Sequence, residues 1–182
     1  MQLIYQYLNK MRGGSRTPIR APFYEIFWSG LGCFFGIAAV YLVGHLQDLH
    51  IEDSLFLVGS FGASAILIYG VPNSPYAQPR NLMGGHIFSA IAGVSCAMLI
   101  SNPMIAAAAA VALAVIVMHL TRSIHPPGGA TALIAVIGGQ NIHALGYWYV
   151  ITPIASGAIL MLIVALITNN LSSQRRYPSY WL

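Results

Sequence analysis

The sequence predicts an all-α integral membrane protein with several membrane crossings. Hydrophobic residues make up 57% of the 182 positions and charged residues only 7%, whereas about 25% of the residues in an ordinary soluble domain are charged. The mean hydropathy is +0.70. The apolar residues also fall into runs that approach the ~20 residues a spanning helix requires. A soluble fold is therefore excluded, and the length indicates a single membrane domain.

Residues 1–21 are too polar for a signal peptide and form a separate N-terminal segment. They contain four basic residues and no acid: Lys10, Arg12, Arg16 and Arg20. Apolar residues from Leu3 to Met11 recur at roughly helical spacing, so we expect a short amphipathic segment on the cytoplasmic surface. Residues 22–172 then form the transmembrane domain, and residues 173–182 form a cytoplasmic tail.

Six apolar segments of two kinds make up the transmembrane domain. Four are suited to full spanning helices: residues 26–46, 82–100, 104–120 and 148–168. The other two, residues 54–70 and 128–139, are rich in glycine or short, and Pro126 and Pro127 precede the second. We expect both to be broken or half helices, which membranes tolerate only where protein or a water-filled cavity satisfies the freed backbone groups.

The placement of the charges favours six crossings. In that arrangement all eight basic residues face the cytoplasm, and Asp48, Glu52 and Asp53 face the other side, as the positive-inside rule requires. Four crossings would place Arg80 and Arg122 less consistently. Both termini are then expected in the cytoplasm. Basic residues at the membrane boundary also account for the net charge of +4 without a nucleic-acid partner.

The two unusual segments resemble each other in sequence. Residues 62–67 read GASAIL and residues 129–134 read GATALI, and each segment lies between two apolar helices. The chain therefore divides into two three-segment repeats, residues 22–100 and 101–172. Because three is an odd number of crossings, the second repeat would be inverted. This layout is typical of secondary transporters that bind substrate near the membrane midplane.

The starts of the two expected half helices define a candidate binding site. Helix N-termini expose unpaired N–H groups and the positive end of the helix dipole, so they bind anions without a charged side chain. Ser64 and Thr131 would add hydroxyl donors. The candidate substrate-binding residues are Gly62, Ala63, Ser64, His125, Gly128, Gly129, Ala130 and Thr131. The alternative is that these small residues only let the helices pack closely.

Two histidines and two arginines are candidates for gating or proton coupling. His125 opens the second broken segment, and it either binds the anion, titrates, or caps a free carbonyl of the break. His86 lies early in a helix, where an ionisable group is costly unless it sits near the surface. Arg80 and Arg122 lie at the cytoplasmic boundary, either as topology determinants or as an anion vestibule. Glu25 is an available partner for either arginine or for Arg20.

Two motifs resemble those of a known family. Residues 123–132 read SIHPPGGATA, and AQPRN at residues 77–81 runs into GGH at residues 84–86. In these motifs the sequence resembles the HPP family of integral membrane proteins, over about residues 22–168. The resemblance implies a nitrite or small-anion transporter. We expect the protein in the bacterial plasma (inner) membrane. Family members are usually described with four transmembrane helices, and the two broken segments would account for the difference from six.

The leading hypothesis is therefore a carrier for a small inorganic anion. An anion channel and a membrane scaffold without transport activity are the alternatives. No paired acids, nucleophile motif or convincing metal-ligand spacing falls within the apolar segments, so we expect no enzyme activity, catalytic residue, metal or cofactor. The expected partners are the small anion and the lipid bilayer. Because six short crossings are few for a carrier, a homo-dimer or homo-trimer is also expected.

Overall fold

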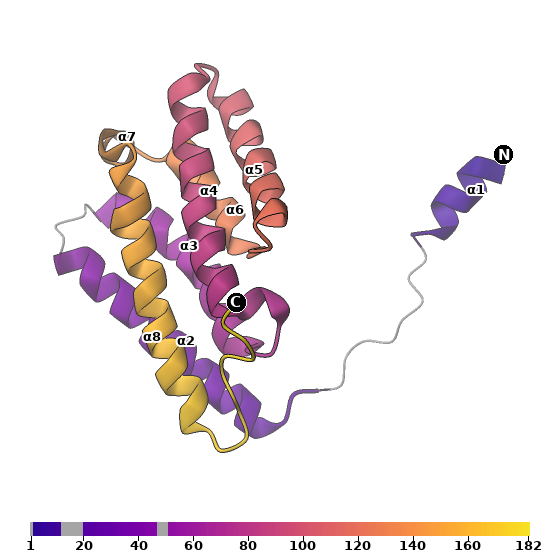
Figure 1. Cartoon of the computed structure of the whole chain (residues 1–182), viewed down its shortest axis with the longest axis vertical. Helices are drawn as coiled ribbons and strands as arrows, with labels where there is room; N and C mark the ends of the chain where they lie inside the picture. Colours follow the sequence, from indigo (N-terminus) through magenta and orange to yellow (C-terminus); the bar gives the residue numbers. More distant parts are fainter. Residues whose placement is uncertain (1, 12–19, 47–50) are drawn as a thin grey trace.

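The computed structural model describes residues 2–11, 20–46 and 51–182, and every regular element in these ranges is helical (Figure 1). The elements are α1 (Gln2–Asn9), α2 (Phe23–Leu46), α3 (Ile51–Gly70), the 3₁₀ turn η1 (Pro75–Ala77), α4 (Pro79–Leu99), α5 (Pro103–Leu120), α6 (Pro127–Ile137), α7 (Gln140–Leu145), the π turn η2 (Val150–Ala155) and α8 (Ser156–Leu171). The predicted all-α polytopic membrane fold is confirmed. Arg12, Arg16 and Asp48 lie outside the described residues.

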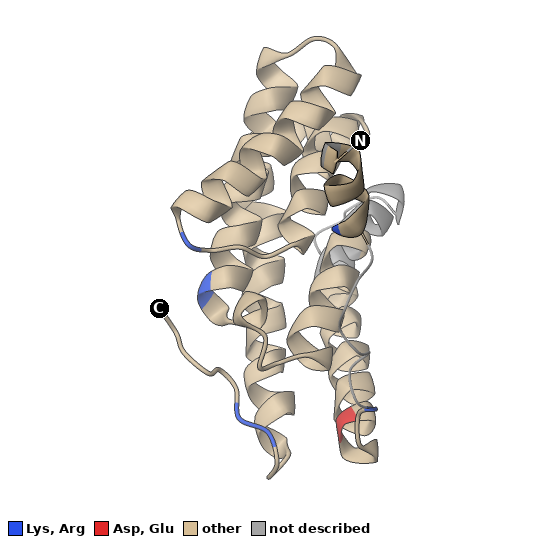
Figure 2. Cartoon of the chain, turned by 90° about the vertical axis from the view of Figure 1, so that its right-hand side faces the viewer, with Lys and Arg blue, Asp and Glu red and all other residues tan. Residues whose placement is uncertain are grey.

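Within the described residues, four helices are long and apolar enough to cross a membrane. They are Phe23–Leu42 of α2, Pro79–Leu99, Pro103–Leu120, and Val150–Leu171, which joins η2 to α8. These are the four full crossings expected from the sequence. Figure 2 shows that the helix bodies carry almost no charged residues, and that the coloured positions lie at turns, helix ends and the tail. The charge pattern is thus that of a bundle embedded in lipid.

The short helix α6 has the half-membrane length that the sequence predicts. Its 11 residues correspond to about 16 Å of rise, roughly half of the ~30 Å hydrocarbon core. Pro127 occupies the first turn of α6, where its missing N–H leaves no gap in the helix. The preceding residues 123–126 form an irregular connection from α5 that brings α6 into the bundle.

Two expected features of the other segments are wrong. The expected break in residues 54–70 is absent, because α3 runs without interruption from Ile51 to Gly70. Glycine costs a helix only about 1 kcal/mol per residue, and a long buried helix tolerates that loss. The last crossing is interrupted instead. Thr152 leaves the helical conformation at φ −132° and ψ 118°, since the residue before a proline is pushed toward the extended region.

The continuous helix α3 and the interruption at Thr152 affect the proposed repeat symmetry. Residues 62–67 lie inside the long helix α3, whereas residues 129–134 lie in the first half of the short helix α6. The two similar hexamers therefore occupy different positions in their helices, and the expectation of two facing half-helix N-termini is wrong. The inverted repeat of residues 22–100 and 101–172 stays a prediction.

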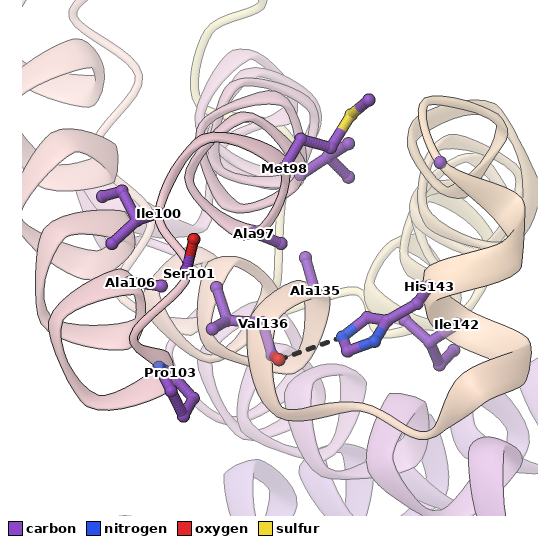
Figure 3. Close-up of a pocket in the computed structure, with 12 residues that line it drawn as sticks. Ala97, Met98, Ile100, Ser101, Pro103, Ala106, Ala135, Val136, Ile142 and His143 are labelled. Atoms are coloured by element: carbon purple, nitrogen blue, oxygen red, sulfur yellow. Dashed lines mark hydrogen bonds between the residues drawn. The ribbon is translucent and has the colours of Figure 1, made fainter.

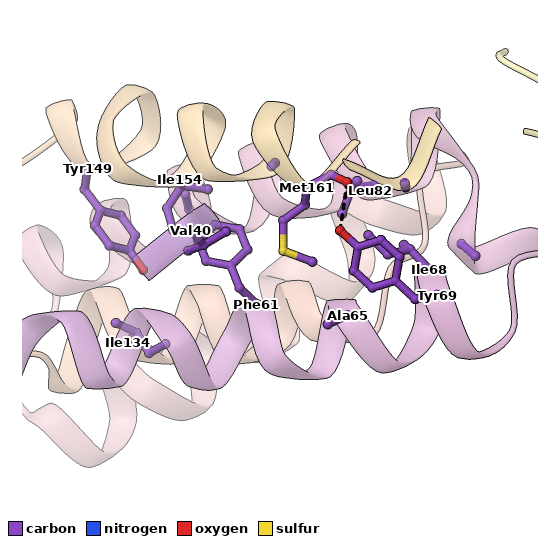
Figure 4. Packing of buried hydrophobic residues seen from close by; sticks show 14 of the residues in the cluster. Val40, Phe61, Ala65, Ile68, Tyr69, Leu82, Ile134, Tyr149, Ile154 and Met161 are labelled. Atoms are coloured by element: carbon purple, nitrogen blue, oxygen red, sulfur yellow. Dashed lines mark hydrogen bonds between the residues drawn. The ribbon is translucent and has the colours of Figure 1, made fainter. Parts of the chain in front are cut away.

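The helices pack as two groups, which meet where α3 contacts α6 and where α4 contacts η2 and α8. On one side, α4 and α6 contact α5 mainly through small side chains, with Ala106, Ala110 and Ala114 buried at one-turn intervals. On the other side, α2, α3 and α8 pack through larger residues such as Tyr69 and Met161 (Figure 4). The Tyr69 hydroxyl there donates to the Met161 carbonyl at 3.1 Å. The small-residue side lets α6 approach α4 closely.

A group of polar residues joins the ends of α2 and α8 to the tail, and we call it the tail clasp: Glu25, Ser29, Asn169 and Arg175. The Arg175 side chain is only 2% exposed and forms an ion pair with Glu25, which is 26% exposed. Its guanidinium also donates to Ser29 Oγ at 2.8 Å and to Asn169 Oδ1 at 3.1 Å. The partner of Glu25 is therefore Arg175, and neither Arg80 nor Arg122.

The rest of the tail lies against the turn between α3 and α4. The Tyr177 hydroxyl donates to the Ala77 carbonyl at 2.8 Å, and the Ser179 N–H donates to Gln78 Oε1 at 2.8 Å. Burial raises the pKa of the Tyr177 hydroxyl above its usual range, so this group stays a donor at any physiological pH. The start of α2, the end of α3, the start of α4 and the end of α8 thus lie at one end of the bundle.

Candidate functional site

Five polar side chains meet in the interior of the bundle, and we call them the polar cluster: Ser60, Ser64, His86, His125 and Thr131. All five are fully buried. Ser60 and Ser64 come from α3, His86 from α4, Thr131 from α6, and His125 from the connection before α6. No other group of side chains in the described chain brings two imidazoles together away from solvent. A buried polar group of this kind must find hydrogen-bond partners or destabilise the fold.

The polar cluster satisfies this demand within itself. Ser64 Oγ lies 2.7 Å from His86 Nε2 and 2.9 Å from His125 Nε2. Thr131 Oγ1 lies 2.7 Å from His86 Nδ1 and 2.6 Å from Ser60 Oγ. These distances are those of good hydrogen bonds. The two rings are also close, with centroids 5.0 Å apart.

One end of the cluster is anchored to the turn between α3 and α4. His125 Nδ1 lies 2.8 Å from the carbonyl oxygen of Tyr76 in η1. A carbonyl can only accept, so Nδ1 carries the proton. The contact connects the buried ring to Tyr76, and the Tyr76 side chain is 46% exposed. The cluster therefore extends from the interior of the bundle to one of its ends.

Glycines at the α4–α6 contact bring the two family-like motifs together. A Cβ on Gly85 would overlap the Cβ of His125, and one on Gly84 would lie 2.7 Å from Ser123 Cβ. A Cβ on Gly128 would lie 2.6 Å from the carbonyl oxygen of Gly85. Only glycine permits this approach. The GGH and HPPGG motifs are therefore two halves of one contact.

Side chains at the start of α4 secure the same connection from outside. Asn81 Nδ2 donates to the Ile124 carbonyl at 2.8 Å, and Arg80 Nη2 donates to the Thr121 carbonyl at 2.8 Å. Arg122 is exposed and adopts φ 54°, a left-handed conformation that turns the chain after α5. Neither arginine bonds to the polar cluster, so both lie outside it.

The depth of the cluster follows from the helix geometry. His86 lies two turns into α4, or about 10 Å from its start at 1.5 Å per residue. Ser64 lies a similar distance before the end of α3. His86 is fully buried within the bundle, so its imidazole is not exposed at the protein surface. An imidazole at this depth is costly unless it is fully hydrogen-bonded.

The N-terminus of α6 differs from the expected anion site. The Gly128 N–H donates to the His125 carbonyl at 2.8 Å, and the Gly129 N–H donates to the Pro126 carbonyl at 3.0 Å. These two backbone donors were expected to be unpaired, and they are already bonded. The donors in the site are therefore hydroxyls and imidazoles rather than backbone groups.

The structure thus brings together four of the predicted site residues, Ser64, His86, His125 and Thr131, with Gly128 packed directly beside them. Gly62 is half-buried, and Ala63 is exposed on α3, away from the cluster. Gly129 and Ala130 are also half-buried, and a Cβ on Gly129 would approach only Val111, at 3.9 Å. These four residues hold no polar contact with the cluster, because they lie on other faces of their helices.

Three polar residues of the region were missed. Ser60 precedes Ser64 by one helical turn, and this spacing would have identified it had residues 54–70 been interpreted as one continuous helix. The Tyr149 hydroxyl donates to the Thr131 carbonyl at 3.0 Å. Ser89 is buried beside Gly128, and its hydroxyl has no hydrogen-bond partner in the described structure. Nothing in the local sequence marks Tyr149 or Ser89.

A cavity of about 280 Å³ lies at the other end of α6 (Figure 3). Its walls come from the ends of α4 and α6, the start of α5, and α7, with Met98, Pro103 and Ile142 among the lining residues. His143 also lines it and donates from Nε2 to the Val136 carbonyl at 3.0 Å. The cavity therefore occupies space beyond the point where the short helix stops.

Tight packing separates this cavity from the polar cluster. A Cβ on Gly93 would lie 2.5 Å from the Ala132 carbonyl oxygen and 2.8 Å from Ala135 Cβ. Along α4 the order is His86, Gly93, and then the cavity-lining Val94. The tight α4–α6 contact at Gly93 therefore lies between the cluster and the cavity.

Fold and site define a class: a polytopic helical membrane protein whose interior holds a polar cluster around a His-Pro-Pro connection and a half-length helix. The chain belongs to the HPP transmembrane family, because the model of the HPP transmembrane region matches residues 18–178. Within the described residues, no three His, Cys, Asp or Glu side chains are grouped as metal ligands.

Two curated relatives come from Dictyostelium discoideum, and both are named only as transmembrane proteins. One is 47% identical over 97% of this chain and 57% of its own length, and the other is 43% identical over 98% of this chain and 64% of its own length. The chain thus spans about three-fifths of each relative. No solved structure matches. Because this organism is not a bacterium, the relatives support a membrane protein without supporting a bacterial plasma membrane.

Proposed function

We propose that the protein carries a small inorganic anion across the membrane, with the polar cluster as its binding site and nitrite as the leading substrate. The observation that carries the proposal is the burial of two imidazoles and three hydroxyls between α3, α4 and α6, away from lipid and water. Polar groups at such depth are costly and mark solute pathways in membrane proteins. Nitrite enters through the resemblance to HPP-family anion transporters.

The chemistry of the polar cluster favours an anion over a metal cation. The side chains offer O–H and N–H donors, and no carboxylate of the described residues bonds to any of them. Hard cations require several oxygen ligands, usually including carboxylates. A nitrite ion instead presents small acceptor oxygens, which suit hydroxyl and imidazole donors. Binding would replace hydrogen bonds inside the cluster, so the substrate would exchange partners with Ser64 and Thr131.

The cavity beyond α6 supports access from one side, and the contact of His125 with the η1 turn supports access from the other. The α4–α6 contact at Gly93 lies between them, and it would have to open during transport. A carrier opens to one side at a time, whereas a channel would provide both routes at once. We also propose that both termini are cytoplasmic, consistent with the shared end of the bundle where α2 begins and α8 ends.

The test is uptake by purified protein reconstituted into liposomes. We expect saturable uptake that is stimulated by nitrite on the opposite side, with weaker or no uptake of nitrate, formate, bicarbonate and chloride. Single-channel current would favour the channel alternative. Absence of uptake for every anion would contradict the proposal and favour a scaffold role.

A matched pair of variants assigns uptake to the cluster. Thr131→Val keeps the side-chain shape and removes the hydroxyl that bridges Ser60 and His86, so nitrite uptake should fall at least about tenfold, in line with the loss of one hydrogen bond to a bound charge. Thr168→Val removes a buried threonine hydroxyl of α8 that bonds only to the Val164 carbonyl. It should retain uptake. Equal uptake by the two variants would exclude the cluster as the binding site.

Homo-oligomerisation is a further part of the proposal. Large apolar side chains such as Phe34 and Phe35 of α2 are exposed on the single chain, and they contact either lipid or another copy. Mass measurement of the protein in lipid nanodiscs distinguishes a dimer or trimer from a monomer.

A further inference from the structure

We infer that the polar cluster is a proton relay, and that the protein moves one proton together with each anion. The inference rests on the proposed function for the identity of the anion, and on the directed order of the hydrogen bonds for the proton path. Two features of the cluster support it independently.

The first feature is that the position of every proton in the cluster follows from one backbone carbonyl. Because Tyr76 O can only accept, the Nδ1 of His125 is a donor, and Nε2 of a neutral His125 is an acceptor. Ser64 then donates to that Nε2 across 2.9 Å and accepts from Nε2 of His86 across 2.7 Å. With Ser64 donating to His125, the tautomers of both neutral rings follow from this one carbonyl.

The same logic continues to the other end of the cluster. Since His86 donates from Nε2, its Nδ1 accepts from Thr131 Oγ1 at 2.7 Å, and Thr131 in turn accepts from Ser60 Oγ at 2.6 Å. From Ser60 to the Tyr76 carbonyl the chain contains no break: Thr131, His86, Ser64 and His125 each accept on one side and donate on the other. Chains of this kind polarise one another and conduct protons by successive short transfers.

One relay step balances without any redox partner. A proton that arrives with the anion, as nitrous acid, adds to Ser60 Oγ, the proton of Ser60 moves to Thr131, and that of Thr131 moves to Nδ1 of His86. His86 is then an imidazolium that donates to Thr131 and to Ser64, while His125 keeps its Nδ1 proton on the Tyr76 carbonyl. The reverse transfers return the proton to the departing nitrite, so one proton enters with the anion and one leaves with it.

Two longer contacts offer the serine hydroxyls alternative hydrogen-bond acceptors. Ser60 Oγ lies 3.3 Å from the Pro127 carbonyl, and Ser64 Oγ lies 3.3 Å from the Ser60 carbonyl. Each hydroxyl can rotate its proton to one of these alternative acceptors while the chain reverses. The nearby titratable groups stay outside the relay, because the Tyr149 hydroxyl bonds to the Thr131 carbonyl and Arg80 bonds to the Thr121 carbonyl.

The second feature is that the cluster contains no fixed positive charge. Its partners are neutral hydroxyls, imidazoles and carbonyls, and no Lys or Arg side chain of the described residues bonds to it. An uncompensated anion at this depth would pay a large desolvation penalty. A proton delivered through His125 or His86 compensates that charge, and the anion and proton then cross together with no net charge.

The test uses proteoliposomes containing the full chain and an internal pH-sensitive dye. An inward nitrite gradient should acidify the interior faster than in protein-free vesicles, which correct for the diffusion of nitrous acid. An imposed inward acid gradient should raise the initial rate of nitrite uptake severalfold. A membrane potential set with potassium and valinomycin should leave the rate unchanged. Nitrite uptake that follows the membrane potential and leaves internal pH unchanged would overturn the inference while leaving the proposed function intact.

A variant pair assigns the proton path. His86→Gln keeps one donor and one acceptor but cannot pass a proton through the side chain, so nitrite-driven acidification should fall at least tenfold. His119→Gln, exposed in the last turn of α5 and outside both the cavity and the chain of hydrogen bonds, should retain it. Equal acidification by the two variants would overturn the relay.

If wild-type vesicles conduct protons in a His86-dependent manner but take up no nitrite, the relay stands and the proposed anion function fails. If His86→Gln does not fold, the gradient measurements on the wild-type protein decide the question.

Discussion

The polar cluster and the tail clasp are both buried groups of polar side chains, but only the clasp contains formal charges. In the clasp, Arg175 donates to Glu25, Ser29, Asn169 and the Tyr69 carbonyl, and a guanidinium can only donate. Its hydrogen bonds have one possible direction. In the cluster, Ser64, Thr131 and the two imidazoles each both donate and accept, so the bonds can reverse. The clasp is suited to holding helix ends together, and the cluster is suited to moving a solute or a proton.

The difference predicts that stability depends more on the clasp, and transport on the cluster. The Arg175 side chain sits almost without exposure at the meeting point of α2, α3 and α8, whereas each cluster residue has neutral partners that can rearrange. Three substitutions test this division, in decreasing order of expected effect on the free energy of unfolding.

The largest loss of stability is expected for Arg175→Met. Removing the guanidinium leaves Glu25, Asn169 and Ser29 without their donor, and breaking a largely buried ion pair costs about 3 kcal/mol. The measurement is equilibrium unfolding in detergent, with nitrite uptake per folded molecule expected to stay unchanged. Arg176→Met is the matched control, because Arg176 is exposed and should change stability by less than about 0.5 kcal/mol. Equal stability of the two variants would contradict a structural role for the clasp.

A smaller loss is expected for Gly85→Ala. The added methyl group would overlap His125 and push the connection before α6 away from α4, at a cost of about 1–3 kcal/mol. Because the change displaces His125, it should also reduce nitrite uptake per folded molecule, which Arg175→Met should not do. Gly129→Ala is the control, since its Cβ has room. If Gly85→Ala were as stable and active as Gly129→Ala, the motif contact would not position the cluster.

The smallest loss is expected for Tyr177→Phe. The substitution removes the hydrogen bond from the tail to the Ala77 carbonyl and should lower the free energy of unfolding by about 1 kcal/mol. Tyr180→Phe removes a comparable bond to the Pro75 carbonyl, but Tyr180 is exposed and water can replace the lost donor. A thermal shift for Tyr180→Phe as large as that for Tyr177→Phe would show that burial does not decide the strength of these contacts.

The sequence predicts much of the architecture because membrane burial acts locally. The long apolar runs identify the four spanning helices, and Pro126 with Pro127 identifies the short helix α6, since proline cannot continue a helix from the preceding turn. The same reasoning fails for residues 54–70, where glycines and serines suggest a break and the bundle supports a continuous helix. It also fails at Thr152, where Pro153 interrupts a segment whose hydrophobicity alone predicts a regular crossing.

The candidate site is predictable in part for the same reason. His125 and Thr131 belong to the HPP motif, and Ser64 belongs to the related GASAIL stretch, so local sequence identifies them. Ser60 was missed because its significance depends on α3 being continuous. Four other predicted binding residues lie outside the cluster, because a motif does not say which helix face turns inward: Gly62, Ala63, Gly129 and Ala130. The pairing of Arg175 with Glu25 joins positions 150 residues apart, and no local signal indicates it.

By itself, the sequence determined that the chain resides in a membrane, that its elements are helices, and which polar residues lie in apolar surroundings. Hydrophobicity, proline and helical period act over a few neighbouring residues, so these properties follow from local composition. The tertiary structure alone decided which polar groups meet, because hydrogen-bond partners such as Ser64, His86 and His125 are brought together by the packing of separate helices. It also decided that α6 presents side chains rather than free backbone N–H groups, since its first turn is closed by carbonyls of the connection that precedes it.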